Sequence, residues 1–254
     1  MKISDVISKK YNISKRLAKK YIKERAVKIN GKTVKSDDGI FPSCDVTLDI
    51  HTEKAQYNLQ DYLIAHHENI IFFYKPPFMH TERLRLEDKL TISDIVEEHF
   101  PDFNLISRLD YETDGVIPAI SKNLNIEFIE KQYLALIHGR FDKQVTLFNK
   151  IDAEKRKKVK VSDEQTGAET LIEPIRYFKE FTLVKVTVEE ATRHQIRALL
   201  SHINHPIAGD KMYGSLDNFD RLMLRCQKVM INDTFCSSKF LKKFIKTCKS
   251  FTER

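Results

Sequence analysis

Three segments of the chain hold polar residues whose types and spacing could do chemistry. The first is SRLD at 107–110, with TDG at 113–115 close behind it. An aspartate in such a turn most often caps the local backbone, but a carboxylate held beside a cation can also act as a nucleophile or a base. Asp110 is therefore the first catalytic candidate.

The second segment is RHQIR at 193–197, which is expected to lie on a helix. Arg193 and Arg197 are four residues apart, so they would share one helix face. An ordinary amphipathic helix has the same pattern, but here HPIAGDKMYG follows, with the turn residues Pro206 and Gly209. Two arginines beside a sharp turn could clamp a phosphate or a carboxylate. The opposite, apolar face would consist of Ile196, Leu199, Leu200 and Ile203.

The third segment is a basic stripe near the N-terminus. Ser14 is expected to cap a helix over 15–24, and the Asn30-Gly31 pair that follows is typical of a type I′ hairpin turn. A solvated surface helix is the simpler interpretation of a charge run, but further cations on the hairpin favour phosphate binding. The stripe consists of Lys15, Arg16, Lys19, Lys20 and Lys23, and the hairpin unit adds Arg25, Lys28, Lys32 and Lys35.

Familiar cofactor and metal motifs are missing from the sequence. There is no GxxxxGK or GxGxxG loop, no HExxH and no GxSxG. Seven glycines in the whole chain leave little for a glycine-rich nucleotide cradle, and His202 and His205 have no companion ligands at metal spacing. We therefore expect neither a metal nor a cofactor.

The composition favours a polyanionic partner. The 254 residues include 43 Lys and Arg against 36 Asp and Glu, a formal net charge of +7, and such an excess attracts polyanions. The four cysteines form no CxxC pair, the opening MKISDV lacks the apolar core of a secretory signal, and no stretch approaches the roughly 20 apolar residues of a membrane span. The expectation is a soluble, cytoplasmic protein that binds nucleic acid.

The elements that must position these residues include more strands than helices. Residues 70–73 are predicted to form a buried strand that ends at Pro76-Pro77, and Thr91 is expected to cap a helix. Residues 132–137 and 183–188 are further predicted strands. The larger part of the chain is thus expected to be an α+β structure with a mixed sheet.

The expected domain boundaries follow from these patterns. Residues 1–50 form a compact basic unit, 51–69 a polar linker and 70–235 the larger domain. Residues 236–254 form a basic amphipathic tail. The simpler interpretation of the tail is a helix docked on its own domain, and the alternative is a contact with RNA or a membrane surface.

Both domains resemble known RNA-related families. Residues 1–50, with SKRLAKKYIKERAVKINGKTVK, resemble the αL (S4-like) RNA-binding module of a small-subunit ribosomal protein. Residues 70–235 resemble the RluA-type pseudouridine synthases through SRLDYETDG, KQYLALIHG and RHQIRALLSHINHPIAGDKMYG in the family's order, with YKPPFMHT and RLMLRC as weaker supports. The resemblance implies the pseudouridine synthase fold, with a mainly antiparallel sheet, and isomerisation of specific uridines in structured RNA. Ribosomal RNA is the first expected substrate and transfer RNA the other option.

The same resemblance implies roles for individual residues. Asp110 corresponds to the catalytic carboxylate, Tyr133 to the aromatic residue that stacks on the target uracil, and Arg197 to the partner of Asp110. Arg108 resembles the arginine that fills the place of the flipped base. The reaction needs no cofactor. Further RNA contacts are expected from Lys75, Arg193, His194 and Gln195.

The sequence departs from the family within these motifs. Ser107 stands where the family has histidine, Asp114 where it has serine, and 191–193 reads Ala-Thr-Arg in place of Gly-Arg-Thr. The changes concern RNA positioning more than chemistry. They leave open a catalytically inactive RNA-binding or ribosome-assembly protein with the same fold, and also a basic protein with no RNA role. A monomer is the default expectation.

Overall fold

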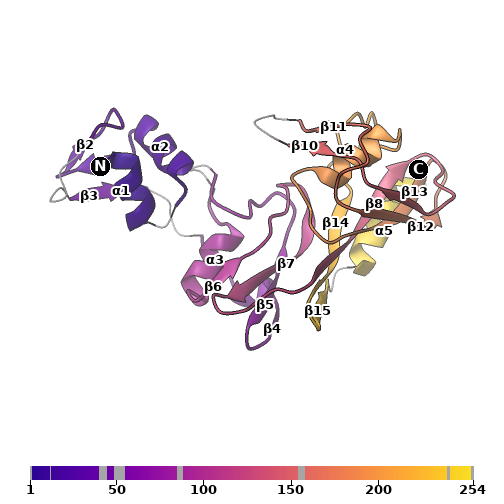
Figure 1. Cartoon of the computed structure of the whole chain (residues 1–254), viewed down its shortest axis with the longest axis horizontal. Helices are drawn as coiled ribbons and strands as arrows, with labels where there is room; N and C mark the ends of the chain where they lie inside the picture. Colours follow the sequence, from indigo (N-terminus) through magenta and orange to yellow (C-terminus); the bar gives the residue numbers. More distant parts are fainter. Residues whose placement is uncertain are drawn as a thin grey trace. The chain divides into compact units, whose positions relative to one another are not determined.

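The chain divides into two compact units (Figure 1). The computed structural model describes residues 2–11, 13–39, 45–48, 55–84, 88–153, 158–238 and 241–252. The first unit is Met1–Gln56 with Glu82–Thr91, and the second is Tyr57–Thr81 with Ile92–Arg254. Each unit has a hydrophobic core of its own.

The first unit packs two helices on a small antiparallel sheet of order β2-β1-β3. Ser14 caps the second helix, because its hydroxyl accepts a hydrogen bond from Leu17 N at 3.2 Å. Asn30 and Gly31 have φ of 48° and 78°, the left-handed pair of a type I′ turn, so the predicted hairpin is confirmed. The elements are α1 (Ile3–Lys10), α2 (Lys15–Lys23), β1 (Val27–Ile29), β2 (Lys32–Thr33) and β3 (Val46–Leu48).

The second unit is built on a ten-stranded sheet of main order β4-β5-β7-β14-β8-β13-β12-β9, with β15 beside β14 and β6 beside β7. β7 and β14 run parallel and the other pairs antiparallel, so the predicted α+β class with a mixed, mainly antiparallel sheet is confirmed. The strands are β4 (Leu63–His66), β5 (Ile70–Lys75), β6 (Phe103–Leu105), β7 (Asp114–Ser121), β8 (Ile129–His138), β9 (Val145–Leu147), β12 (Thr170–Tyr177), β13 (Phe181–Val188), β14 (Leu224–Ile231) and β15 (Thr234–Ser237). Also present are η1 (Leu59–Asp61), α3 (Ile92–His99), β10 (Ile151–Asp152), β11 (Lys160–Val161), α4 (Gln195–His202) and α5 (Leu241–Thr252).

A glycine permits the close approach of the parallel strands β7 and β14. Gly115 has a φ of 132°, and a Cβ on it would lie 2.1 Å from the carbonyl oxygen of Cys226. A side chain at this position is therefore excluded. Cys226 is the register partner of Gly115 on one side and of Tyr133 on the other, so the start of β7 and the middle of β8 flank the same point of β14.

The expected linker over 51–69 is wrong in its second half. η1 and β4 lie there, and Leu63 of β4 pairs with Phe73 of β5. β4 is a short edge strand whose side chains are mostly half-buried, and its apolar run of three residues, Leu63 to Ala65, is too short to indicate a strand by itself. The second unit begins at Tyr57, and 51–54 lie outside the described residues. The assignment of Glu82–Thr91 to the first unit was not predicted from the sequence.

The C-terminal residues belong to the second unit. β15 extends past the expected domain end at 235 to Ser237. α5 buries Phe244 and Cys248 in the core of the unit, with exposed fractions of 1% and 0%. The tail is therefore a docked helix, the simpler of the two interpretations. In the part of the chain that the structure describes, no helix is both long and apolar enough to cross a membrane.

Candidate active site

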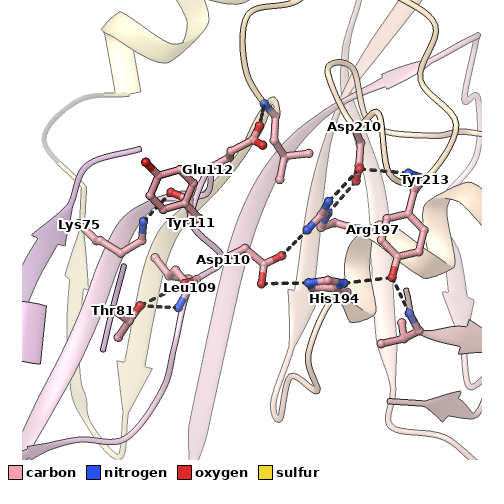
Figure 2. A network of polar contacts seen from close by, with 12 residues as sticks. Lys75, Thr81, Leu109, Asp110, Tyr111, Glu112, His194, Arg197, Asp210 and Tyr213 are labelled. Atoms are coloured by element: carbon pink, nitrogen blue, oxygen red, sulfur yellow. Dashed lines mark hydrogen bonds and ion pairs between the residues drawn. The ribbon is translucent and has the colours of Figure 1, made fainter. Parts of the chain in front are cut away.

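Asp110 lies in the loop between β6 and β7, where the backbone is fixed on both sides of it (Figure 2). The Thr81 hydroxyl accepts from Leu109 N and donates to Leu109 O, both at 3.1 Å. On the other side, Lys75 Nζ donates to the Tyr111 carbonyl at 3.3 Å. These contacts hold the candidate carboxylate in one place, as a catalytic group requires.

The burial of Lys75 contradicts its predicted role as an RNA contact. Its side chain is completely buried, and Nζ donates to the carbonyls of Pro76, Met79 and Tyr111 at 3.0, 2.8 and 3.3 Å. Burial lowers the pKa of Lys75 to about 7, while three carbonyl acceptors match the three donors of the ammonium form. Lys75 therefore ties the 76–79 turn to the Asp110 loop.

Arg197 of α4 joins Asp110 to a second carboxylate (Figure 2). Arg197 Nη1 lies 2.7 Å from Asp110 Oδ2. Its Nε and Nη2 bind Asp210 Oδ2 and Oδ1 at 2.7 and 2.8 Å, the fork geometry of a strong arginine–carboxylate pair. Burial alone would lower the pKa of Arg197, but the two carboxylates raise it above its ordinary value. The predicted pairing of Arg197 with Asp110 is thus present in the structure.

His194 approaches the other oxygen of Asp110. Its Nε2 lies 3.7 Å from Asp110 Oδ1, and its Nδ1 lies 3.1 Å from the Tyr213 hydroxyl. That hydroxyl accepts from Val159 N at 3.0 Å, so its own hydrogen can go to Nδ1, which places the imidazole proton on Nε2. Burial lowers the pKa of His194 against the opposing effect of Asp110. A neutral imidazole therefore directs its N–H at Asp110.

Arg193 does not share a helix face with Arg197, which corrects the prediction. α4 begins at Gln195, and His194 before it has a φ of 58°, a left-handed conformation outside the helical range. Arg193 precedes this break, is exposed, and donates to the Ala153 carbonyl at 3.2 Å. The helical spacing fails because the chain turns at His194.

Gln195 is a structural residue, so its predicted RNA contact is also wrong. It is 2% exposed. Its Oε1 accepts from both the backbone N and the hydroxyl of Thr192 at 3.0 Å, and its Nε2 donates to the Thr170 hydroxyl at 2.9 Å. Gln195 therefore holds the 192–195 turn against β12.

Tyr133 lies in the middle of β8, beside Cys226 of β14 and Val186 of β13. It is 5% exposed. Burial raises the pKa of its phenol well above the ordinary value, and the Cys226 thiol and the Asp110 carboxylate add to the rise. Tyr133 is therefore a neutral aromatic ring within the electrostatic reach of Asp110.

A pocket of about 280 Å³ is lined by Arg197, the partner of Asp110, and by Asp210, and we call it the active-site pocket. Glu112 at its edge accepts from Leu222 N at 3.0 Å. The sequence motifs HPIAGDKMYG and RLMLRC supply much of its wall, although neither Asp210 nor Arg221 was singled out from them. The lining includes Phe78, Glu112, Arg197, Lys211, Asp220 and Arg221.

Asp114, one of the departures from the family pattern, lies in a buried ion cluster. Its Oδ1 lies 2.9 Å from Arg221 Nη1 and its Oδ2 lies 3.1 Å from Arg225 Nη2. The Tyr74 hydroxyl donates to it at 3.3 Å. Asp114 and Arg225 are 2% and 1% exposed. The aspartate therefore compensates the buried charge of Arg225 and also binds Arg221, which lines the pocket.

The basic stripe of α2 lies opposite its apolar face, as predicted. Leu17 and Tyr21 are buried, whereas Arg16, Lys19 and Lys23 are exposed. Lys15 pairs with Asp5 at 2.8 Å, and Lys20 with Glu24 at 3.5 Å and with the Leu84 carbonyl at 3.0 Å. In the second unit, Arg108 is exposed within the Asp110 loop, two residues before Asp110.

Comparison with solved structures defines the class of fold. The human RNA pseudouridylate synthase domain containing 4 matches with a TM-score of 0.56 and 15% identity, over 76% of this chain and 94% of that one. The human RNA pseudouridylate synthase domain containing 1 matches with a TM-score of 0.55 and 19% identity, over 72% and 85%. The large unit thus has the pseudouridine synthase fold.

Sequence comparisons identify the family. The RNA pseudouridylate synthase family model matches residues 69–202 and the S4 domain model residues 1–38. An uncharacterized RNA pseudouridine synthase of Helicobacter pylori (strain ATCC 700392 / 26695) is 30% identical over 239 residues, 89% of this chain and 91% of the relative. The ribosomal large subunit pseudouridine synthase C of Yersinia pestis is 34% identical over 124 residues, 43% and 39% of the two chains. The chain belongs to the RNA pseudouridylate synthase family, and the predicted reaction class, uridine isomerisation in RNA, is confirmed.

Proposed function

We propose that this chain isomerises selected uridines of ribosomal RNA to pseudouridine with Asp110 as the catalytic carboxylate. The observation that carries the proposal is that the exposed fraction of the side chains decreases along one network of ion pairs. The side chains of Asp110, Arg197 and Asp210 are 26%, 11% and 0% exposed. Asp110 is thus the carboxylate that a substrate can reach, and Arg197 binds and orients it from behind.

The reaction moves the uracil from an N1 to a C5 attachment on the same ribose. The bond between N1 and C1′ breaks, a bond between C5 and C1′ forms, C5 loses a proton and N1 gains one, so no atom is lost overall. The Asp110 carboxylate can attack as a nucleophile or remove a proton, and the same pair with Arg197 supports either route. Tyr133 supplies a neutral ring beside the uracil.

The target base must first leave its stack, which costs a few kcal/mol. We propose that Arg108, which is exposed within the Asp110 loop, fills the space that the base leaves. The exposed cations of α2 would hold the RNA through its phosphates. Ribosomal RNA is the proposed substrate because the similar protein of Yersinia pestis is named for the large ribosomal subunit.

The test is turnover by the purified protein on ribosomal RNA from cells that lack the gene. Wild type should form pseudouridine, and Asp110→Asn should form none while it binds the RNA with unchanged affinity, because the substitution removes only the charge. The matched control is Asp102→Asn, since Asp102 is 90% exposed in the same unit. Turnover by Asp110→Asn would contradict the assignment. RNA binding without product by wild type would favour the inactive assembly protein.

A further inference from the structure

Two exposed aromatic side chains lie beside the candidate catalytic carboxylate. Phe78 and Tyr111 are 51% and 45% exposed, and their rings meet edge to face with centroids 5.9 Å apart. His80 stacks on Tyr111 at 4.6 Å. Tyr111 directly follows Asp110, and Figure 2 shows it on the side of Asp110 away from Arg197. Phe78 also lines the active-site pocket, so the aromatic surface is continuous with it.

The backbone at Phe78 is in an unfavourable conformation. Its φ is 61°, a left-handed value that is rare for a bulky residue and that glycine adopts freely. The turn is nevertheless held in place, because Phe78 N donates to the Tyr111 carbonyl at 2.8 Å and Lys75 binds the carbonyls on either side. A ring that stays exposed buries little apolar area, so it contributes little to the free energy of folding. Strain retained at a site without a packing gain indicates a role in binding.

The chemistry of the pocket wall favours a base over a phosphate as the partner of these rings. Three basic and three acidic side chains line the pocket, so net charge there does not attract a phosphate. Aromatic rings, in contrast, stack unpaired bases of any sequence. A base next to a flipped nucleotide has lost one stacking neighbour and offers such a face.

We propose that Phe78 and Tyr111 form a stacking subsite for the unpaired base adjacent to the target uridine. The proposal rests on the proposed function, since it takes the Asp110 loop as the place where the uridine binds. In this proposal the site contacts a second nucleotide in addition to the target uridine. Lys75 and the Tyr111 carbonyl act as its support by fixing the turn that carries Phe78.

The test measures stacking without turnover, in the full-length chain carrying Asp110→Asn. The probe is a short single-stranded RNA with one uridine next to 2-aminopurine, whose fluorescence is quenched by stacking. The parent should quench the probe, and Phe78→Gly or Tyr111→Ala should lose the quenching and bind about tenfold more weakly. Phe78→Trp should keep both. In an RNA that is abasic at the adjacent position, Phe78→Gly should bind as tightly as the parent protein.

Two matched controls separate the ring from the backbone and from exposed aromatic residues in general. Asn204→Gly changes another exposed residue with a φ of 61°, and Phe235→Ala removes a phenylalanine that is 59% exposed on β15. Both should quench and bind like the parent. Phe78→Gly should unfold at the same or a higher temperature than the parent, because strain is relieved.

Several results would overturn the subsite. These are an unquenched probe with the parent, unchanged binding by Phe78→Gly, a weakening that persists on the abasic RNA, or a lower unfolding temperature, which would show that the ring is kept for folding. Failure of the proposed function is distinguishable, because it appears as absent pseudouridine with wild type while the quenching measurement needs no product.

Discussion

Among the single residues of the site, Arg197 is held between two carboxylates, Asp110 and Asp210. Asp210 is buried and binds it through two hydrogen bonds, so Asp210→Asn leaves Arg197 with a weaker partner. We expect the free energy of unfolding to fall by about 3 kcal/mol, because removal of one charge of a buried pair leaves the opposite charge buried without full compensation. Urea unfolding measures the loss, and Asp102→Asn serves as the surface control. A change below about 0.5 kcal/mol, the usual surface effect, would contradict the pairing.

His194 should make the free energy of unfolding depend on pH. Burial lowers its pKa in the folded chain, so above the ordinary value of about 6.5 both folded and unfolded chains carry a neutral imidazole. As the pH falls through that value, the unfolded chain takes up the proton first and the folded state loses stability. The loss between pH 7 and pH 5 should be smaller in His194→Gln than in wild type. Identical pH profiles of unfolding would contradict the neutral imidazole.

At the scale of elements, the parallel pair β7 and β14 carries the buried cluster around Asp114. Asp114→Ser restores the residue type expected from the family, but it leaves the buried Arg225 without this carboxylate. We expect a loss of about 3–5 kcal/mol in the free energy of unfolding. Glu173→Gln, which breaks a partly exposed pair with Lys185 at 2.7 Å, should change it far less. Equal effects of the two substitutions would show that the cluster stabilises nothing.

Some helices, strands and turns could be predicted from the sequence, whereas the roles of several residues within them could not. The α2 cap, the hairpin turn and the strands β5, β8 and β13 follow local patterns, so they were predictable. Lys75 and Gln195 were misassigned because a polar residue type in the sequence does not reveal that a strand or turn buries its side chain. Their partners, the Tyr111 carbonyl and the Thr170 hydroxyl, are distant in sequence. The Arg193 error arose because nothing local signals the left-handed φ of His194.

For the whole molecule, we propose that the first unit binds RNA and that the second unit carries the chemistry. Neutralising Arg16, Lys19 and Lys23 together should weaken RNA binding and flatten the dependence of log Kd on log salt by about 0.7–0.9 per lost phosphate contact. The control removes the same charge from the second unit, through the exposed Lys122, Lys143 and Lys179. A titration of RNA affinity against salt measures both slopes. Equal slopes for the two triple variants would contradict a specific role of the stripe.

Pseudouridine mapping of ribosomal and transfer RNA from cells without the gene tests whether this chain modifies RNA through Asp110. Complementation with wild type should restore modification at one or more uridines of ribosomal RNA, and complementation with Asp110→Asn should restore none at the same protein level. A map that is unchanged by loss of the gene would contradict the proposed activity, and a map that is restored by Asp110→Asn would contradict the catalytic role of Asp110.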